Sequence, residues 1–124
     1  MTRMKNIINI VVVIVSLGFF TGCSTVSDED LRAAHIAKEK GALIIDVRSK
    51  KEYDTGHIKD SINIPIDYLD KMYGRIPKEK EIIVYCRSGS RSMVAARLLR
   101  EQGWTVHDVA TQKDWERKLP LPKK

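Results

Sequence analysis

The sequence EIIVYCRSGSRSMVAARLLR, residues 81–100, decides the fold. It begins with a short run of β-branched and aromatic residues, 82–85, which is typical of a buried strand. It ends with apolar residues at helical spacing over 93–99, and Gly103 follows as a helix stop. Strands that alternate with helices predict a parallel sheet with helices on both faces. We therefore predict a buried strand, a loop over 86–91 and then a helix.

The loop between this strand and this helix has the composition of an anion-binding site around a thiol. Cys86 ends the strand, and Arg87 and Arg91 lie in the loop that follows. Backbone N–H groups of such a loop can converge on one point, and the helix N-terminus adds partial positive charge. These groups should favour the ionised thiolate, which is the reactive form of cysteine. The alternative is a buried structural cysteine, which would not need two arginines and a glycine beside it.

Further segments are predicted to be strands or helices from their local patterns. Ser27 is a candidate N-cap for a helix that Gly41 closes, and Ser49 with Glu52 has the spacing of a capping box. Asp67 is expected to cap a third helix that runs to about Tyr73. The other expected strands cover residues 43–45, 62–64 and 104–107.

The ordered motifs along the chain resemble a rhodanese domain, the domain of a family of sulfurtransferases. The resemblance covers residues 26–122. It implies a rhodanese-like α/β fold, with a five-stranded, mainly parallel sheet and helices on both faces. Besides the Cys86 loop, the segments that carry it are Asp46-Val47-Arg48, Glu52-Tyr53, Gly56-His57-Ile58, Ile62-Asn63-Ile64-Pro65 and Gly103-Trp104.

The resemblance also implies roles for individual residues. Cys86 would be the catalytic nucleophile, while Asp46 and Arg48 would hold the loops around it. His57 is expected to be structural, because a thiolate that amides and a helix terminus stabilise needs no base. The expected substrate-binding residues are Arg87, Ser88, Gly89, Ser90, Arg91 and Ser92.

One departure from the family lies downstream of the catalytic loop. Ala110-Thr111 stands where the family usually has two glycines. Glycines permit a positive φ and a close approach of the backbone. Their replacement suggests a reshaped loop beside the pocket.

The implied reaction moves sulfane sulfur from an anionic donor such as thiosulfate to a thiol acceptor, through a persulfide on Cys86. The first alternative is a persulfide carrier or redox-sensing thiol without efficient turnover. The second is a phosphatase or arsenate reductase on the same fold. Those relatives have five residues between the cysteine and the arginine, whereas four separate Cys86 from Arg91. The third, an inactive docking domain, usually lacks the cysteine.

The first 22 residues differ in kind from the rest and are predicted to be an export signal. Arg3 and Lys5 precede an almost wholly apolar run over 7–20, and no acidic residue occurs before Asp28. This run is shorter than the ~20 residues that a membrane-spanning helix needs, although an uncleaved membrane anchor is the alternative.

The end of this segment, Phe20-Thr21-Gly22-Cys23, resembles the lipobox of a bacterial lipoprotein. The resemblance implies that cleavage occurs before Cys23, which is then acylated. The protein is therefore expected in the cell envelope, lipid-anchored to a membrane and facing the periplasm or another extracytoplasmic space.

The remaining composition limits the partners. Cys23 and Cys86 are the two cysteines, so a scaffold of several disulfides is excluded, and acylation of Cys23 would leave Cys86 as the one thiol. The sulfur carried by a Cys86 persulfide would then pass to an external acceptor. A thioredoxin-like reductant is a candidate partner. The net charge of +6 is spread along the chain, so we expect no nucleic-acid partner. We expect neither a metal nor an organic cofactor.

Overall fold

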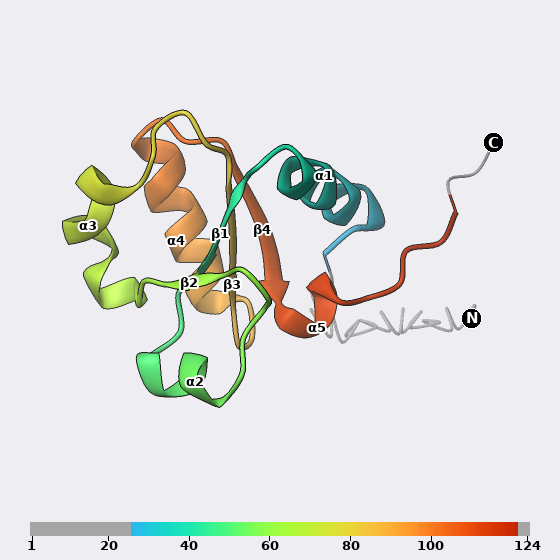
Figure 1. Cartoon of the computed structure of the whole chain (residues 1–124), viewed down its shortest axis with the longest axis horizontal. Coiled ribbons are helices and arrows are strands. Elements are labelled where there is room, and N and C mark those ends of the chain that lie inside the picture. Colours follow the sequence, from blue (N-terminus) through green and yellow to red (C-terminus); the bar gives the residue numbers. More distant parts are fainter. Residues whose placement is uncertain (1–25, 122–124) are drawn as a thin grey trace, which may run out of the picture.

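The structure of the chain is a computed structural model that describes residues 26–121, in which helices lie on both faces of one sheet (Figure 1). The sheet has four strands in the order β2-β1-β3-β4, and all neighbouring pairs are parallel. The strands are β1 (Leu43–Asp46), β2 (Ile62–Asn63), β3 (Ile82–Cys86) and β4 (Val106–Thr111).

The prediction of five strands is wrong for the described part of the chain, where four are present. Residues 26 and 27 lead directly into the first helix, so they add no strand before it. The parallel arrangement, the α/β class and the place of Cys86 at the end of an inner strand are confirmed.

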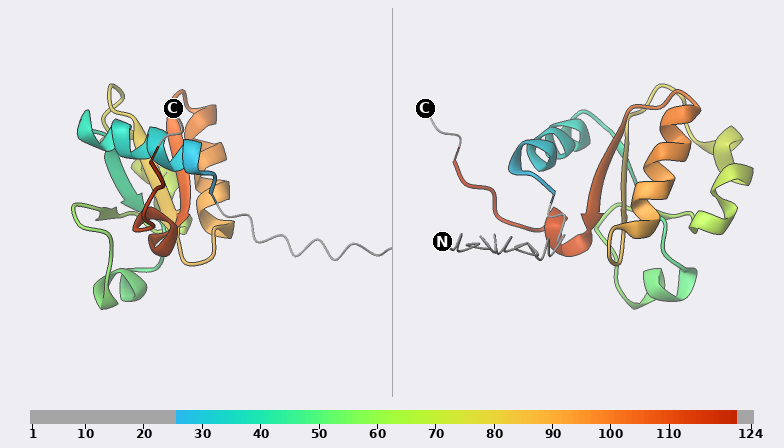
Figure 2. Two further views of the ribbon diagram at one scale, coloured as in Figure 1. Left: turned by 90° about the vertical axis from the view of Figure 1, so that its right-hand side faces the viewer. Right: turned by 180° about the vertical axis from the view of Figure 1, so that it is seen from behind.

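Helices cover both faces of the sheet, with α1 and α4 on opposite sides of β4 (Figure 2). Ser27 caps α1 by accepting a hydrogen bond from the Asp30 backbone at 3.0 Å, and Ser49 and Glu52 form the predicted capping box of α2. The helices are α1 (Asp28–Glu39), α2 (Lys50–Thr55), α3 (Leu69–Met72), α4 (Ser90–Glu101) and α5 (Gln112–Trp115).

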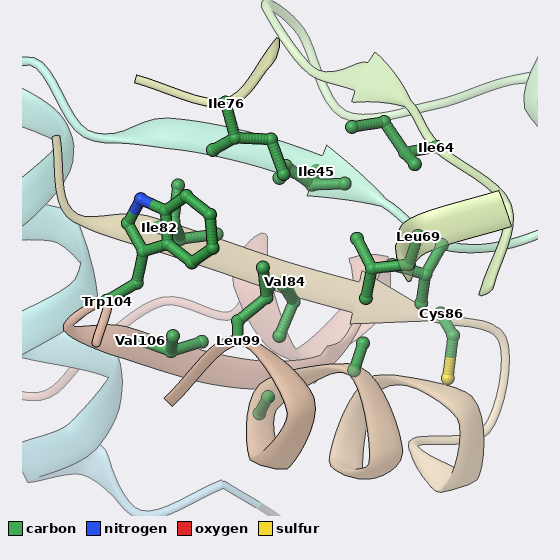
Figure 3. Close-up of a cluster of buried hydrophobic side chains, with 13 residues drawn as sticks. Ile45, Ile64, Leu69, Ile76, Ile82, Val84, Cys86, Leu99, Trp104 and Val106 are labelled. Atoms are coloured by element: carbon green, nitrogen blue, oxygen red, sulfur yellow. The ribbon is translucent and has the colours of Figure 1, made fainter. Parts of the chain in front are cut away.

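Two apolar clusters hold these layers together, one on each face of the sheet. Alternate side chains of a strand point to opposite faces, so successive residues of β3 contribute to different clusters. Ile82, Val84 and Cys86 pack under α3 and α4 (Figure 3), while Ile83 and Tyr85 pack under α1. All five residues of β3 are buried, as the apolar run predicts.

The last strand begins later than predicted, at Val106 rather than Trp104. Trp104 instead ends the turn after α4, where its backbone N–H donates to Leu99 at 3.2 Å. Its indole N–H donates to Pro77 at 3.0 Å while the ring packs in the core. Trp104 therefore serves to bury its large ring in the turn between α4 and β4, and it does not pair as part of the strand.

The predicted helix from Asp67 to residue 73 is broken into three short turns. A 3₁₀ helix, Ile66–Tyr68, precedes α3, and a second one, Tyr73–Arg75, follows it. Pro65 rather than Asp67 stands at the N-cap, and its carbonyl accepts from Tyr68 at 2.9 Å. The i→i+3 bonds that Pro65 starts therefore replace the expected α-helical turn.

The carboxyl ends of β1 and β3 lie side by side, since Asp46 pairs with Tyr85. From β1 the chain continues to β2 on one side, whereas from β3 it continues to β4 on the other side. Ligands of parallel α/β sheets bind at such a point of divergence. None of the helices within residues 26–121 is long and apolar enough to cross a membrane.

Candidate active site

Cys86 lies at the carboxyl end of β3, with its sulfur turned towards the first turn of α4 (Figure 3). The Sγ atom accepts hydrogen bonds from two backbone N–H groups, that of Gly89 at 3.0 Å and that of Ser92 at 3.3 Å. N–H groups that converge in this way stabilise negative charge at the sulfur. The loop therefore has the convergent N–H groups that the sequence predicts, while anion binding by it stays a prediction.

The conformation of this loop depends on Gly89, which has a φ of +92° and stands at the N-cap of α4. A left-handed residue reverses the chain, so that the N–H groups of Gly89 itself and of Ser92 face the same point. The buried Ser92 hydroxyl donates to the Gly89 carbonyl at 3.1 Å and fixes the turn from inside.

The remaining predicted binding residues surround this nest at different depths. Arg87, Ser88 and Ser90 are exposed, and the two serine hydroxyls lie 3.3 Å apart. Cys86 itself exposes 1% of its surface. A small molecule that reaches the sulfur must therefore approach along the exposed side of the loop, where Arg87 is exposed and Arg91 is partly exposed.

Arg91 is engaged in an ion pair that the sequence did not reveal. Its guanidinium donates from both terminal nitrogens to Glu52, at 2.8 and 2.9 Å. The same carboxylate accepts from the backbone and the hydroxyl of Ser49 within the capping box of α2. Glu52 thus joins α2 to the first turn of α4, which carries the Ser92 amide that faces Cys86. Binding of a donor by Arg91 stays a prediction.

Replacement of Glu52 by glutamine tests this link, because glutamine can keep the capping box but carries no charge. The hydrogen bonds from Arg91, and then from Ser49, lower the pKa of Glu52 below its ordinary value. Its stabilising effect is therefore complete above about pH 4.3 and is lost as the pH falls below that value towards the lowered pKa. We expect Glu52→Gln to lose about 0.5–1 kcal/mol at pH 7, since the pair is partly exposed.

The measurement is the free energy of unfolding in urea between pH 3 and pH 7. The difference between the wild type and Glu52→Gln should shrink as the pH falls. Asp54→Asn is the matched control, because its ion pair with Lys50 lies on the surface of the same helix. An equal and pH-independent loss in both variants would contradict the assignment.

A buried polar network lies on the other face of β3, directly behind the thiol. The fully buried Asp46 accepts from Arg48 at 2.6 Å and from the Tyr85 hydroxyl at 2.7 Å. The hydrogen bond to Asp46 raises the pKa of Arg48, and burial raises the pKa of Tyr85. The Tyr85 hydroxyl also accepts from the Ile58 backbone at 3.0 Å. The network fixes the chain before Cys86, as expected for Asp46 and Arg48.

His57 takes part in the turn after α2 and not in an acid–base pair. Its ring is stacked on Tyr53, with ring centroids 3.7 Å apart, and its Nδ1 lies 2.9 Å from the Tyr53 carbonyl oxygen. These contacts agree with the structural role expected for it.

The segment Ala110-Thr111 forms a bulge beside the catalytic loop. Val84 pairs with Asp108 but Cys86 pairs with Thr111, so β4 holds one residue more than β3 over this stretch. Ala110 takes a φ of +58°, and its N–H donates to the Asp108 carboxylate at 2.9 Å. A Cβ atom on Gly89 would lie 3.2 Å from that of Ala110. The segment thus keeps a left-handed residue at one of the two positions where glycine is expected from the resemblance.

The predicted signal, residues 1–22, and the predicted lipidation site Cys23 lie outside the described residues. They therefore stay predictions. Within residues 26–121, Cys86 is the free cysteine, and no group of three or more potential metal ligands occurs there.

Comparison with known proteins identifies the family. The sequence model of the rhodanese-like domain matches residues 29–111, which is more than half of the chain. The chain belongs to the rhodanese-like domain family. A protein named sulfurtransferase from Allochromatium vinosum is 31% identical over 77 residues, which cover 62% of this rhodanese-like chain and 72% of the relative.

Two further matches show the range of this family. The putative sulfur carrier protein YrkF of Bacillus subtilis is 35% identical over 82 residues, which cover 64% of this chain but 44% of that protein. A rhodanese-related protein from Thermoplasma volcanium, known from a crystal structure, has 32% sequence identity to this chain, and the two structures match with a TM-score of 0.60. That match covers 71% of this rhodanese-like chain and 90% of the other.

Proposed function

We propose that this rhodanese-like protein is a sulfurtransferase that moves sulfane sulfur from a small anionic donor such as thiosulfate to a thiol acceptor. The observation that carries the proposal is the pair of amides, from Gly89 and Ser92, that face Cys86 Sγ. Such amides stabilise a thiolate before the reaction and a persulfide anion after it. The relatives named as sulfurtransferases support transfer of sulfur in general.

The proposed reaction has two displacement steps. The Cys86 thiolate attacks the outer sulfur of thiosulfate, the S–S bond of the donor breaks, and its electron pair leaves with sulfite. The acceptor thiolate then attacks the terminal sulfur of the Cys86 persulfide, and the electron pair of that bond returns to Sγ. The exposed Arg87 is placed to attract the sulfonate oxygens, for which a planar guanidinium is well suited. No oxidant or cofactor is consumed.

A membrane-tethered persulfide carrier is the second candidate, and the resemblance to YrkF favours it. The sulfurtransferase and the carrier would both load sulfur on Cys86. Repeated cycles of loading and release are expected of the enzyme alone, so turnover distinguishes the two. A phosphatase or arsenate reductase is disfavoured, because the four residues between Cys86 and Arg91 give a loop too short for the family members with those activities.

The intact mass after incubation with thiosulfate tests the first step. We expect the protein to gain the mass of one sulfur atom, and Cys86→Ser to gain none. Cyanide or a small thiol should then remove the added mass, and repeated release of sulfite would establish an enzyme rather than a carrier. An unchanged mass of the wild type would overturn sulfur transfer from thiosulfate.

The place of action is proposed from the N-terminal sequence. Cleavage before Cys23 and acylation of that residue would anchor the domain to the outer face of a membrane, in the cell envelope. Cys23→Ala should then release the protein from the membrane fraction, and its persistence there would favour an uncleaved signal as the anchor.

A further inference from the structure

The outer face of α4 carries an apolar pair followed by arginines. Met93 and Val94 are 64% and 37% exposed and are neighbours in sequence, whereas most large apolar side chains of the described residues are covered. Arg97 and Arg100 follow one and two turns after Met93, so the three side chains lie along one side of the helix. Together these four residues line a hollow of about 360 Å³, and we call them the α4 stripe.

A second hollow joins the α4 stripe to the start of the described chain. It has a volume of about 310 Å³, and Val26, Ser27, Gly89 and Met93 contribute to its lining. Val26 therefore lies near the Met93 end of the α4 stripe. Gly89, whose N–H faces Cys86, brings the rim of the catalytic loop to this side as well.

The length of chain before Val26 limits how far this side can lie from a membrane. Ser24 and Thr25 lie between Cys23 and Val26, so three chain steps of at most about 3.5 Å each connect the two Cα atoms. A lipid on Cys23 would thus hold Val26 within roughly 10 Å of the lipid surface. The side of the domain that carries the α4 stripe would then lie next to the headgroups.

The chemistry of the α4 stripe matches an anionic lipid surface. Arginine stems cover apolar surface while their charged ends can reach phosphate groups, and exposed apolar side chains enter the boundary between headgroups and acyl chains. The Arg100 guanidinium also donates to the Val106 carbonyl at 2.8 Å, so Arg97 is the arginine of the stripe that contributes most to this attraction. Two carboxylates in the same region oppose this attraction, those of Asp30 and Asp108. Asp30 accepts from the Ser27 hydroxyl and Asp108 from the Ala110 N–H, so both carboxylates are held by bonds within the domain.

We propose that the α4 stripe rests on an anionic membrane surface, so that the catalytic loop faces the lipid headgroups. The inference rests on the lipid anchor of the proposed function, but not on sulfur transfer itself. A tethered domain needs little additional free energy, since contact with the membrane orients it rather than recruits it. Acceptors that reside at the membrane would then meet Cys86 most readily.

Tryptophan fluorescence in the full, membrane-anchored protein tests this orientation. Met93→Trp would be reconstituted in anionic phosphatidylglycerol vesicles with brominated acyl chains, which quench nearby indoles. Ile36→Trp is the matched control, because Ile36 is 50% exposed on α1, across the sheet from α4. We expect quenching of the Met93→Trp signal to exceed that of the control about twofold or more, after subtraction of the wild-type signal.

Charge is tested by Arg97→Glu in the Met93→Trp background. Quenching should fall in anionic vesicles and should change little in zwitterionic ones. Equal quenching at positions 93 and 36 with the protein bound to the vesicles would overturn the proposal and leave the α4 stripe for a protein partner. Protein that fails to sediment with the vesicles would overturn the anchor and, with it, the orientation. Sulfur loading of Cys86 is measured on the same sample. If loading is normal, a negative result concerns the orientation or the anchor and not the proposed sulfur transfer.

Discussion

Asp46→Ala is expected to cost about 3–5 kcal/mol of the free energy of unfolding, the largest effect of any single substitution considered. The Asp46 carboxylate is fully buried and accepts from Arg48 and Tyr85. Its removal would leave a guanidinium that is 13% exposed without its partner, and a buried hydroxyl without its acceptor. Uncompensated buried charge is among the most destabilising defects of a folded protein.

Urea unfolding measures this loss, and Asp54→Ala is the control. Asp54 also pairs with a basic residue, Lys50, but both side chains are more than half exposed. The control should leave the midpoint of unfolding essentially unchanged, because exposed ion pairs contribute little. Midpoints that move equally in the two variants would show that the network behind the thiol does not support the fold.

Gly89→Ala is expected to slow sulfur loading of Cys86 about 100-fold, the effect typical of losing one amide that stabilises an anion. Alanine would have to adopt a φ of +92°, with its Cβ 3.2 Å from that of Ala110. The backbone would move to relieve this contact, and the Gly89 N–H would then leave its position 3.0 Å from Sγ. A loss of about 1–2 kcal/mol in stability should accompany the change.

The rate of sulfur loading from thiosulfate, followed by mass, is the measurement. Gly74→Ala is the control, because a Cβ atom there has no heavy atom within 4 Å and the residue has no positive φ. A second variant, Gly89→Ala with Ala110→Gly, removes the contact but keeps the strained φ. It should recover part of the rate. If Gly89→Ala loaded sulfur at the wild-type rate, the Gly89 amide would not be stabilising the anion.

Local patterns were sufficient to predict most elements that surround the thiol. The apolar run before Cys86, the capping box of Ser49 and Glu52, and the N-cap at Ser27 all appear as expected. Each depends on residues fewer than five positions apart, so its physical cause is contained in the sequence itself. The nest around Cys86 was predictable for a similar reason, since its donors, three and six residues away, belong to the same short loop and the helix start that follows it.

Features that depend on distant residues were missed. The ion pair of Glu52 and Arg91 joins positions 39 residues apart, and each residue had a local role that accounted for it. The true start of β4 was hidden because Trp104 suits a strand as well as a buried corner. Its large ring was free to fill the core between α4 and the loop at Pro77, and that packing decided its place.

The bulge at Ala110 has a consequence for self-association. β4 is an edge strand, and an edge offers a row of unpaired backbone groups to which another chain can add a strand. One extra residue interrupts that row and twists it away from a flat partner. On the membrane surface proposed for this protein, anchored molecules would meet one another often, and this irregular edge would hinder them from joining into a continuous β-structure.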